Sequence, residues 1–168
     1  MSGDPDKAAL FERCVREHGA LVARIAASYE ARPALVDELV QETFAALWRG
    51  LPTLRDPASA RAFLARLTHN TCVTHVRRAV RRPERLLEEG EAEAVETDDP
   101  GPGHAERARL LRAVRQLALG DRQVLTMHLE GFTNAEIGDV LGLAEGTVAV
   151  RLTRARQRLR RMLLETTA

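Results

Sequence analysis

Apolar residues recur at the three- and four-residue spacing of an α-helix along most of the 168-residue chain, whereas runs that alternate apolar and polar residues are absent. Hydrophobic residues make up 45% of the chain and aromatic residues only 4%, so leucine, valine and alanine must fill any core. The clearest apolar stripe, typical of a helix that faces a core, is formed by Val36, Leu39, Val40, Phe44, Leu47 and Trp48. This pattern predicts an all-α protein built from small helical bundles.

Three helices are expected in the N-terminal half of the chain, over residues 8–32, 34–50 and 59–82, after a frayed start at residues 1–7. Gly19 is a candidate break within the first helix. Pro33 suits the first turn of the second helix, where its missing N–H costs nothing. Ser59 is the expected N-cap of the third.

The last third of the chain has the pattern of two short helices joined by a tight turn. Thr133, followed three residues later by Glu136, forms a capping box in which each side chain satisfies a backbone N–H at the start of a helix. Gly142 follows the apolar positions of that helix, where a left-handed residue ends a helix at low cost. A second helix is expected from about Glu145. Two preceding helices, over residues 105–117 and from Asp121 as N-cap to residue 130, are expected to support this helix–turn–helix.

The second helix of this motif has an apolar face and a cationic face, the latter formed by Arg151, Arg154, Arg158 and Arg161. A helix–turn–helix of this kind suits contact with a phosphate backbone. The alternative is an ordinary helical hairpin with a solvated arginine face. In the N-terminal half of the chain, the expected third helix ends in another arginine cluster, formed by Arg77, Arg78, Arg81 and Arg82. Four arginines exceed what the helix dipole requires, which favours phosphate contact over dipole compensation alone.

The net charge of +1 conceals three blocks of different sign. Residues 1–82 carry 13 basic and 9 acidic side chains, residues 83–106 carry one arginine and nine acidic side chains, and residues 107–168 carry 11 arginines and six acidic side chains. The acidic block has almost no hydrophobic periodicity, which is typical of a largely disordered linker. We therefore expect two small helical domains, residues 1–82 and 107–168, joined by a flexible acidic linker over residues 83–106.

Catalytic and metal-binding patterns are not found in the sequence. Cys14 and Cys72 lie far apart and are expected to be reduced core thiols. On a helix, His69 and His75 point in directions about 240° apart, so they cannot converge on a metal with Cys72. No phosphate loop or nucleophile elbow is present, and we expect no cofactor and no enzymatic activity. With a polar N-terminus and no apolar run near the ~20 residues that span a bilayer, a cytoplasmic protein is predicted.

Two separated blocks of the chain resemble a known family. Residues 39–49, LVQETFAALWR, look like region 2.2 of bacterial sigma-70 family RNA polymerase sigma factors, the segment that binds core polymerase. Residues 63–78, FLARLTHNTCVTHVRR, resemble the regions that melt and read the minus-10 promoter element. Residues 117–163 resemble region 4, which reads the minus-35 element. The short acidic linker in place of a region 3 domain is similar to the extracytoplasmic function (ECF) subgroup.

The resemblance implies which side chains act. The exposed face of the second helix would dock on a coiled coil of the largest polymerase subunit through Asp37, Glu38, Gln41 and Glu42. The minus-10 DNA would be contacted by Phe63, Arg66, Asn70, Arg77 and Arg78, of which Phe63 suits a core position equally well. The minus-35 DNA would be contacted by Thr147, Ala149, Val150, Arg151 and Arg154.

At Ala149 and Val150 the chain departs from the family, which usually has a basic residue and a serine there. Either these apolar side chains meet thymine methyl groups in the major groove, or minus-35 binding is weakened. The sequence leaves both readings open.

The function that the resemblance implies is that of a promoter-specificity subunit, which partners core polymerase and promoter DNA. In the family, region 4 also meets the polymerase flap, the linker's acidic charge can mimic nucleic acid, and an anti-sigma factor is a usual partner. Two alternatives remain: a stand-alone helix–turn–helix transcriptional regulator, and a degenerate factor that acts only through protein–protein contacts.

Overall fold

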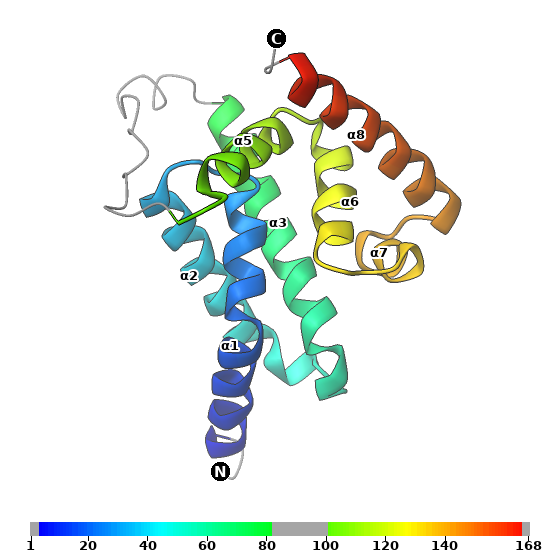
Figure 1. The fold of residues 1–168 in the computed structure, drawn as a ribbon. Helices are drawn as coiled ribbons and strands as arrows, with labels where there is room; N and C mark the ends of the chain where they lie inside the picture. The colour runs from blue at the N-terminus through cyan, green and yellow to red at the C-terminus, as the bar shows by residue number, and fades with distance from the viewer. Residues whose placement is uncertain (1–3, 82–100, 166–168) are drawn as a thin grey trace.

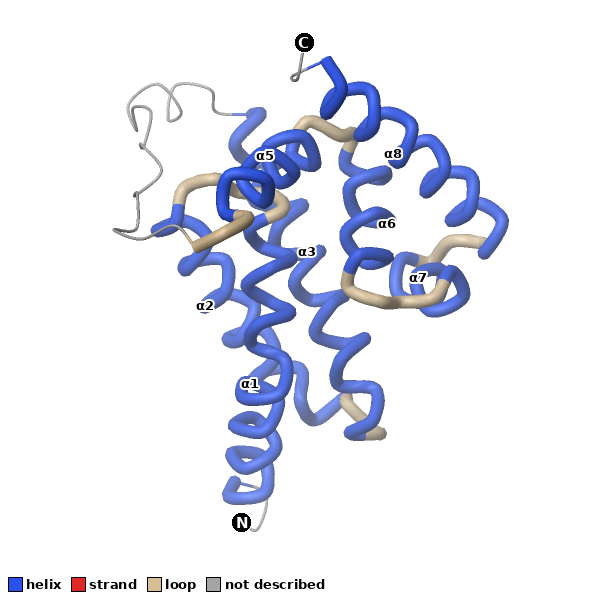
Figure 2. Tube along the Cα trace, in the orientation of Figure 1, coloured by secondary structure: helices blue, strands red, loops and turns tan. Residues whose placement is uncertain are grey.

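The computed structural model describes residues 4–81 and 101–165, which form helices joined by turns and short loops (Figure 1, Figure 2). The N-terminal body consists of α1 (Asp4–Ala27), α2 (Pro33–Gly50) and α3 (Ala60–Arg81). The C-terminal body consists of α5 (His104–Arg115), α6 (Leu119–Leu129), α7 (Asn134–Leu141) and α8 (Glu145–Glu165). The expected all-helical fold with two helical bodies is confirmed. Most of the expected linker, residues 83–100, lies outside the described residues, but its last three residues already belong to α5.

The first helix differs from its expected form in both extent and continuity. It begins at Asp4, inside the segment expected to fray, and it ends at Ala27 rather than near residue 32. The last turn is closed by Ser28, whose hydroxyl donates to the carbonyl oxygen of Ile25 at 2.6 Å. No break occurs at Gly19. A Cβ at Gly19 would lie 3.9 Å from the ring of Phe44, so this glycine lies where α2 approaches α1.

The core of the N-terminal body is filled by all three helices, which pack against one another. Val22, Leu47 and Leu64, one from each helix, are fully buried in it. The expected N-cap Ser59 instead lies in a short 3-10 turn, Pro57–Ser59. The carboxylate of Asp56 caps that turn by accepting the N–H of Ala58 at 3.0 Å.

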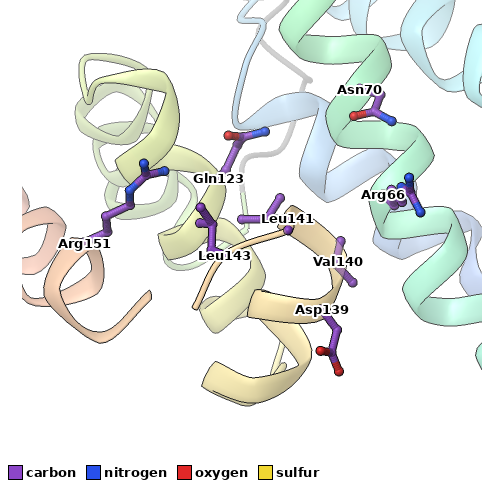
Figure 3. A pocket seen from close by; sticks show the side chains of 9 residues that line it. Arg66, Asn70, Gln123, Asp139, Val140, Leu141, Leu143 and Arg151 are labelled. Carbon is purple, nitrogen blue, oxygen red and sulfur yellow. The ribbon is translucent and has the colours of Figure 1, made fainter. Parts of the chain in front are cut away.

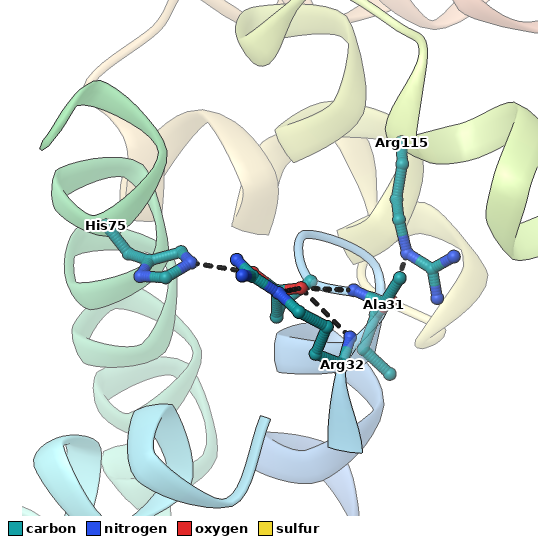
Figure 4. A network of polar contacts seen from close by, with 6 residues as sticks. Ala31, Arg32, His75 and Arg115 are labelled. Carbon is teal, nitrogen blue, oxygen red and sulfur yellow. Dashed lines mark hydrogen bonds and ion pairs between the residues drawn. The ribbon is translucent and has the colours of Figure 1, made fainter. Parts of the chain in front are cut away.

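A buried carboxylate ties the end of α1 to the start of α2 and to α3 (Figure 4). Glu30 accepts hydrogen bonds from the backbone N–H of Arg32 at 2.9 Å, from the Arg32 guanidinium and from His75 Nε2 at 2.8 Å. Burial opposes the ionisation of Glu30, but these hydrogen bonds outweigh it and hold its pKa far below the usual value. Glu30 is only 8% exposed, so these hydrogen bonds are shielded from water. They hold the three helices together at their junction.

The helix–turn–helix has the local structure that the sequence predicted. The Thr133 hydroxyl accepts the N–H of Glu136 at 3.2 Å, and the Glu136 carboxylate accepts the N–H of Thr133 at 2.7 Å. Gly142 ends α7 in the left-handed region, with φ at 67°. The expected start of the recognition helix at Glu145 is also observed.

Asp121 does not cap α6, contrary to expectation. The helix begins at Leu119, so its N-cap is Ala118, three residues before Asp121, and no side chain caps it. Asp121 is buried in the first turn and bonded to α8, as described below. The local capping preference therefore predicted the wrong role for Asp121, because its carboxylate is bonded to a residue of α8.

The two bodies pack against each other, a contact that no pattern in the sequence indicates. The α3 helix contacts α6 and α7, and one apolar cluster runs from α1 and α3 into the C-terminal body. Figure 1 shows α6 and α7 next to α3, with α8 on the far side of α6. Among the described helices, none is long and apolar enough to cross a membrane.

Candidate polymerase and nucleic-acid interfaces

The face of α2 that points away from the core carries the predicted polymerase-binding residues. Asp37, Glu38, Gln41 and Glu42 are all exposed. On the opposite side of the helix, Leu39 and Leu47 are buried. The structure therefore brings all four predicted residues together on one polar, predominantly acidic surface of the N-terminal body.

The predicted minus-10 residues form a stripe along α3. Arg66, Asn70 and Arg77 are exposed, and at 100° per residue their directions fall within about 40° of one another. Arg78 is exposed beside the end of this stripe. Two guanidinium groups flanking an amide can hold phosphates while the amide contacts a base edge.

Phe63 is the exception among the predicted minus-10 residues. Its ring is half-buried and lies against Gly50, where a Cβ would approach the ring to 2.9 Å. It belongs to the apolar cluster of the N-terminal body. The structure thus gives Phe63 a core contact, and its role at DNA stays a prediction.

Four of the five predicted minus-35 residues on α8 are exposed, namely Thr147, Ala149 and Val150 in its first two turns and Arg154 one turn later. Val150 retains 66% exposure although it is a large apolar side chain. The adjacent Val148 is fully buried and anchors the helix. An apolar side chain left exposed at the N-terminal end of a recognition helix lies where such helices contact bases.

The two predicted minus-35 arginines contact α6. Arg154 makes a bidentate pair with Asp121, with distances of 3.0 Å from Nε to Oδ2 and 2.5 Å from Nη2 to Oδ1. The Asp121 side chain is 1% exposed and that of Arg154 is 55% exposed, so the pair ties the surface of α8 to the interior of α6. The half-buried Arg151 lies over Gly120, where a Cβ would come within 2.8 Å of Nη1.

The stripe on α3 and the helix–turn–helix share one cavity of about 320 Å³ (Figure 3). Arg66 and Asn70 line it from α3, Asp139 lines it from α7, and Arg151 lines it from α8. Part of the predicted minus-10 surface therefore faces part of the predicted minus-35 body.

The histidines considered for a metal site make other contacts. His69 Nδ1 lies 2.7 Å from the Tyr29 hydroxyl in the core, and His75 bonds to Glu30. Over residues 4–81 and 101–165, no group of three metal-ligating side chains comes together.

Sequence reasoning missed Asp121 as a partner of α8, and it missed Arg24, Arg61 and Glu130 at the contact between the bodies. The Asp121–Arg154 pair joins residues 33 positions apart, and the Arg24–Glu130 pair joins residues 106 positions apart. No local pattern signals such pairs.

This architecture defines a two-body helical protein with a DNA-binding helix–turn–helix, and comparison with known proteins names its class. The family model for sigma-70 region 2 matches residues 14–82, and the model for sigma-70 region 4 matches residues 107–159. The chain belongs to the sigma-70 family as an ECF RNA polymerase sigma factor with regions 2 and 4, and it acts in transcription initiation without being an enzyme.

Individual relatives match over nearly the whole chain. RNA polymerase sigma factor CnrH of Cupriavidus metallidurans is 31% identical over 164 residues, covering 91% of this chain and 86% of the relative. ECF RNA polymerase sigma factor SigL of Mycobacterium tuberculosis is 32% identical over 163 residues, covering 95% and 92% respectively.

Solved structures give the same fold. CnrH in complex with the cytosolic domain of CnrY superposes with a TM-score of 0.67 at 30% identity, covering 94% of this chain and 89% of that chain. The sigma factor RpoE in complex with the anti-sigma factor NepR, from Bartonella quintana, superposes with a TM-score of 0.72 at 21% identity, covering 91% and 96%.

Proposed function

We propose that this sigma factor attaches to core RNA polymerase through the acidic face of α2 and grips a promoter at two points. The stripe on α3 contacts the minus-10 element, and the start of α8 contacts the minus-35 element. The observation that carries the proposal is the exposure of Asn70 on α3 and of Val150 on α8, together with the acidic face on a third helix. The proposed units are residues 1–82 and 107–168, with residues 83–106 as the linker.

The polymerase contact uses charge-assisted bonds from polymerase arginines to Asp37, Glu38 and Glu42, with Gln41 as an amide partner. The surface on polymerase is the coiled coil of its largest subunit, and the C-terminal body also meets the flap. The protein acts in the cytoplasm, where its polymerase is.

The minus-35 contact is more apolar than is usual in the family. Ala149 and Val150 meet thymine methyl groups in the major groove, while Thr147, Arg151 and Arg154 hold the backbone. Replacing a contacted thymine by uracil removes one methyl group. Such a replacement should weaken binding about four-fold, which corresponds to about 0.8 kcal/mol per buried carbon. Equal affinity for the two bases at every minus-35 position would remove Ala149 and Val150 from base recognition.

An anti-sigma factor is a further proposed partner. The related CnrH, at 30% identity, is held by the cytosolic domain of CnrY in its solved complex. The similarity extends over 94% of this chain, which supports a partner of the same kind here.

Run-off transcription with core polymerase on genomic fragments tests the proposal directly. The complete chain should direct initiation from defined start sites that core polymerase alone does not use. Tight, polymerase-independent binding to palindromic DNA would instead support a stand-alone regulator. Absence of transcripts from every fragment would support a factor that acts only through protein contacts.

A further inference from the structure

The first turn of α6 supports both arginines that α8 carries for the minus-35 element. Arg154 is bonded there to Asp121, and Arg151 lies over the neighbouring Gly120. Figure 3 shows the Arg151 side chain extending from α8 toward α6. Two consecutive residues of α6 thus contact the two guanidinium groups of the recognition helix.

Arg151 differs in exposure from its neighbours on the same face of α8. At 100° per residue, Thr147, Val150 and Arg151 point within about 100° of one another. Val150 is 66% exposed, whereas Arg151 is half-buried although its side chain is longer. A long charged side chain is shielded in this way when its stem lies along the protein surface. The Arg151 guanidinium is therefore directed to the flank of α8 that faces α6, and not outward with Val150.

Gly120 provides the space that the Arg151 guanidinium occupies. A Cβ at this position would lie 2.8 Å from Arg151 Nη1 and 3.4 Å from Cζ. The backbone does not require glycine here, because Gly120 lies within α6 and has a negative φ. Glycine is also less favourable than alanine in a helix. The use of glycine at this position is therefore the room that it leaves for Arg151.

Room, rather than charge, accounts for the position of Arg151. The first turn of a helix carries a positive partial charge, which disfavours a cation. Within residues 4–81 and 101–165, Arg151 takes part in no hydrogen bond or ion pair. A methyl group at Gly120 would displace the guanidinium at low cost, because the displaced atoms are the end of a flexible side chain.

Arg154 is held at the same turn by hydrogen bonds. Its Nε and Nη2 donate to the Asp121 carboxylate at 3.0 Å and 2.5 Å, and the Asp121 side chain is 1% exposed. A bidentate bond to a buried carboxylate fixes the plane of the guanidinium. Displacing Arg151 would therefore leave Arg154 in place, so the two arginines can be tested separately.

We propose that Gly120 is a specificity-determining residue for the minus-35 element. By leaving room for Arg151 against α6, it keeps that guanidinium off the bases and directs it to the phosphate backbone. Arginine reads guanine by aiming two N–H groups at N7 and O6, which Arg151 does not present from this position. Base selection then falls to Ala149 and Val150. The inference rests on the contact of α8 with the minus-35 element in the proposed function.

Transcription by the holoenzyme, from promoters that carry each of the four bases at each minus-35 position, tests the role of Gly120. The unchanged chain should show no guanine preference that depends on Arg151. Gly120→Ala should gain a guanine preference at one position of about five-fold or more, the lower end of what one arginine–guanine contact gives. The melting temperature of G120A should not fall, because alanine favours the helix.

Arg151→Ala and the double variant G120A/R151A show whether the gain passes through Arg151. R151A should lower initiation by a similar factor on every promoter of the set and leave the base preferences unchanged, because phosphate contacts carry no sequence information. The double variant should have the base preferences of R151A alone, since the gain in G120A needs the displaced guanidinium.

Two results would overturn the role of Gly120. One is a guanine preference of the unchanged chain that R151A removes, because Arg151 would then already read a base; this result does not depend on how well G120A folds. The other is a set of base preferences in G120A equal to that of the unchanged chain. Absence of any base preference at the minus-35 positions in the unchanged chain would instead reject the DNA contact of α8, and with it both the proposed function and the role of Gly120.

Discussion

His69 shows how one buried side chain couples the fold to pH. It is 0% exposed in the core of the N-terminal body, and its Nδ1 lies 2.7 Å from the Tyr29 hydroxyl, while Nε2 has no partner among the described residues. Burial lowers the pKa of His69 from 6.5 to about 4, because a proton would place an uncompensated charge in the core. The folded protein therefore requires a neutral ring.

We expect the free energy of unfolding to fall by about 2 kcal/mol between pH 7.5 and pH 5 on account of His69. Above pH 6.5 both states are neutral at this residue, whereas between pH 6.5 and 4 the unfolded chain binds a proton that the folded chain excludes. Urea unfolding at both pH values measures the change, and H69Q, which cannot titrate, is the control. Glu30, whose pKa is lowered, changes the free energy of unfolding only below about pH 4.5. An equal pH dependence of H69Q and the unchanged chain would contradict this account.

At the scale of elements, the angle between α7 and α8 depends on close backbone approach in the turn. Gly138, in α7, is buried, and a Cβ there would lie 2.6 Å from the carbonyl oxygen of Leu143. Gly146, in the first turn of α8, has open space around it. A side chain would therefore be obstructed at Gly138 but not at Gly146, although both glycines lie in helices of the same motif.

Gly138→Ala should destabilise the protein by about 1–3 kcal/mol, because the turn between α7 and α8 must move to admit a methyl group. Gly146→Ala is the matched control and should be neutral or stabilising by up to ~1 kcal/mol, from helix propensity. Thermal unfolding of both variants is the measurement. If G138A is as stable as G146A, the close approach does not set the turn.

The molecule as a whole distributes its proposed contacts over separate faces. The acidic face of α2 lies outside the contact between the bodies, which uses α1, α3 and the C-terminal helices. In the structure Asp37 and Glu38 of α2 are exposed, and so are Arg66 and Asn70 of α3.

Reversing Asp37 and Glu38 to lysine should weaken association with core polymerase on the order of ten-fold or more, because charged partners on polymerase would face like charge. Co-purification with core polymerase measures the loss. Glu12 and Glu17, exposed on α1, provide a double lysine control of equal charge change. The melting temperature should be unchanged in both. Undiminished co-purification would exclude this patch from the interface.

The sequence by itself determined the helical class, the capping box at Thr133 and Glu136 and the stop at Gly142, whereas the roles of the surfaces on α2, α3 and α8 stay predictions. These features depend on residues three or four positions apart, where helix geometry dictates the contact. The family pattern in the same segments was equally local and was confirmed.

Only the tertiary structure decided what Asp121, Phe63 and Glu130 do. Asp121 bonds Arg154 instead of capping α6, Phe63 packs on Gly50, and Glu130 joins the two bodies. The Asp121 and Glu130 partners are 33 and 106 positions away along the chain, so no periodicity encodes them. Long-range pairing follows from how apolar faces pack, and that packing also determines that the two helical bodies meet.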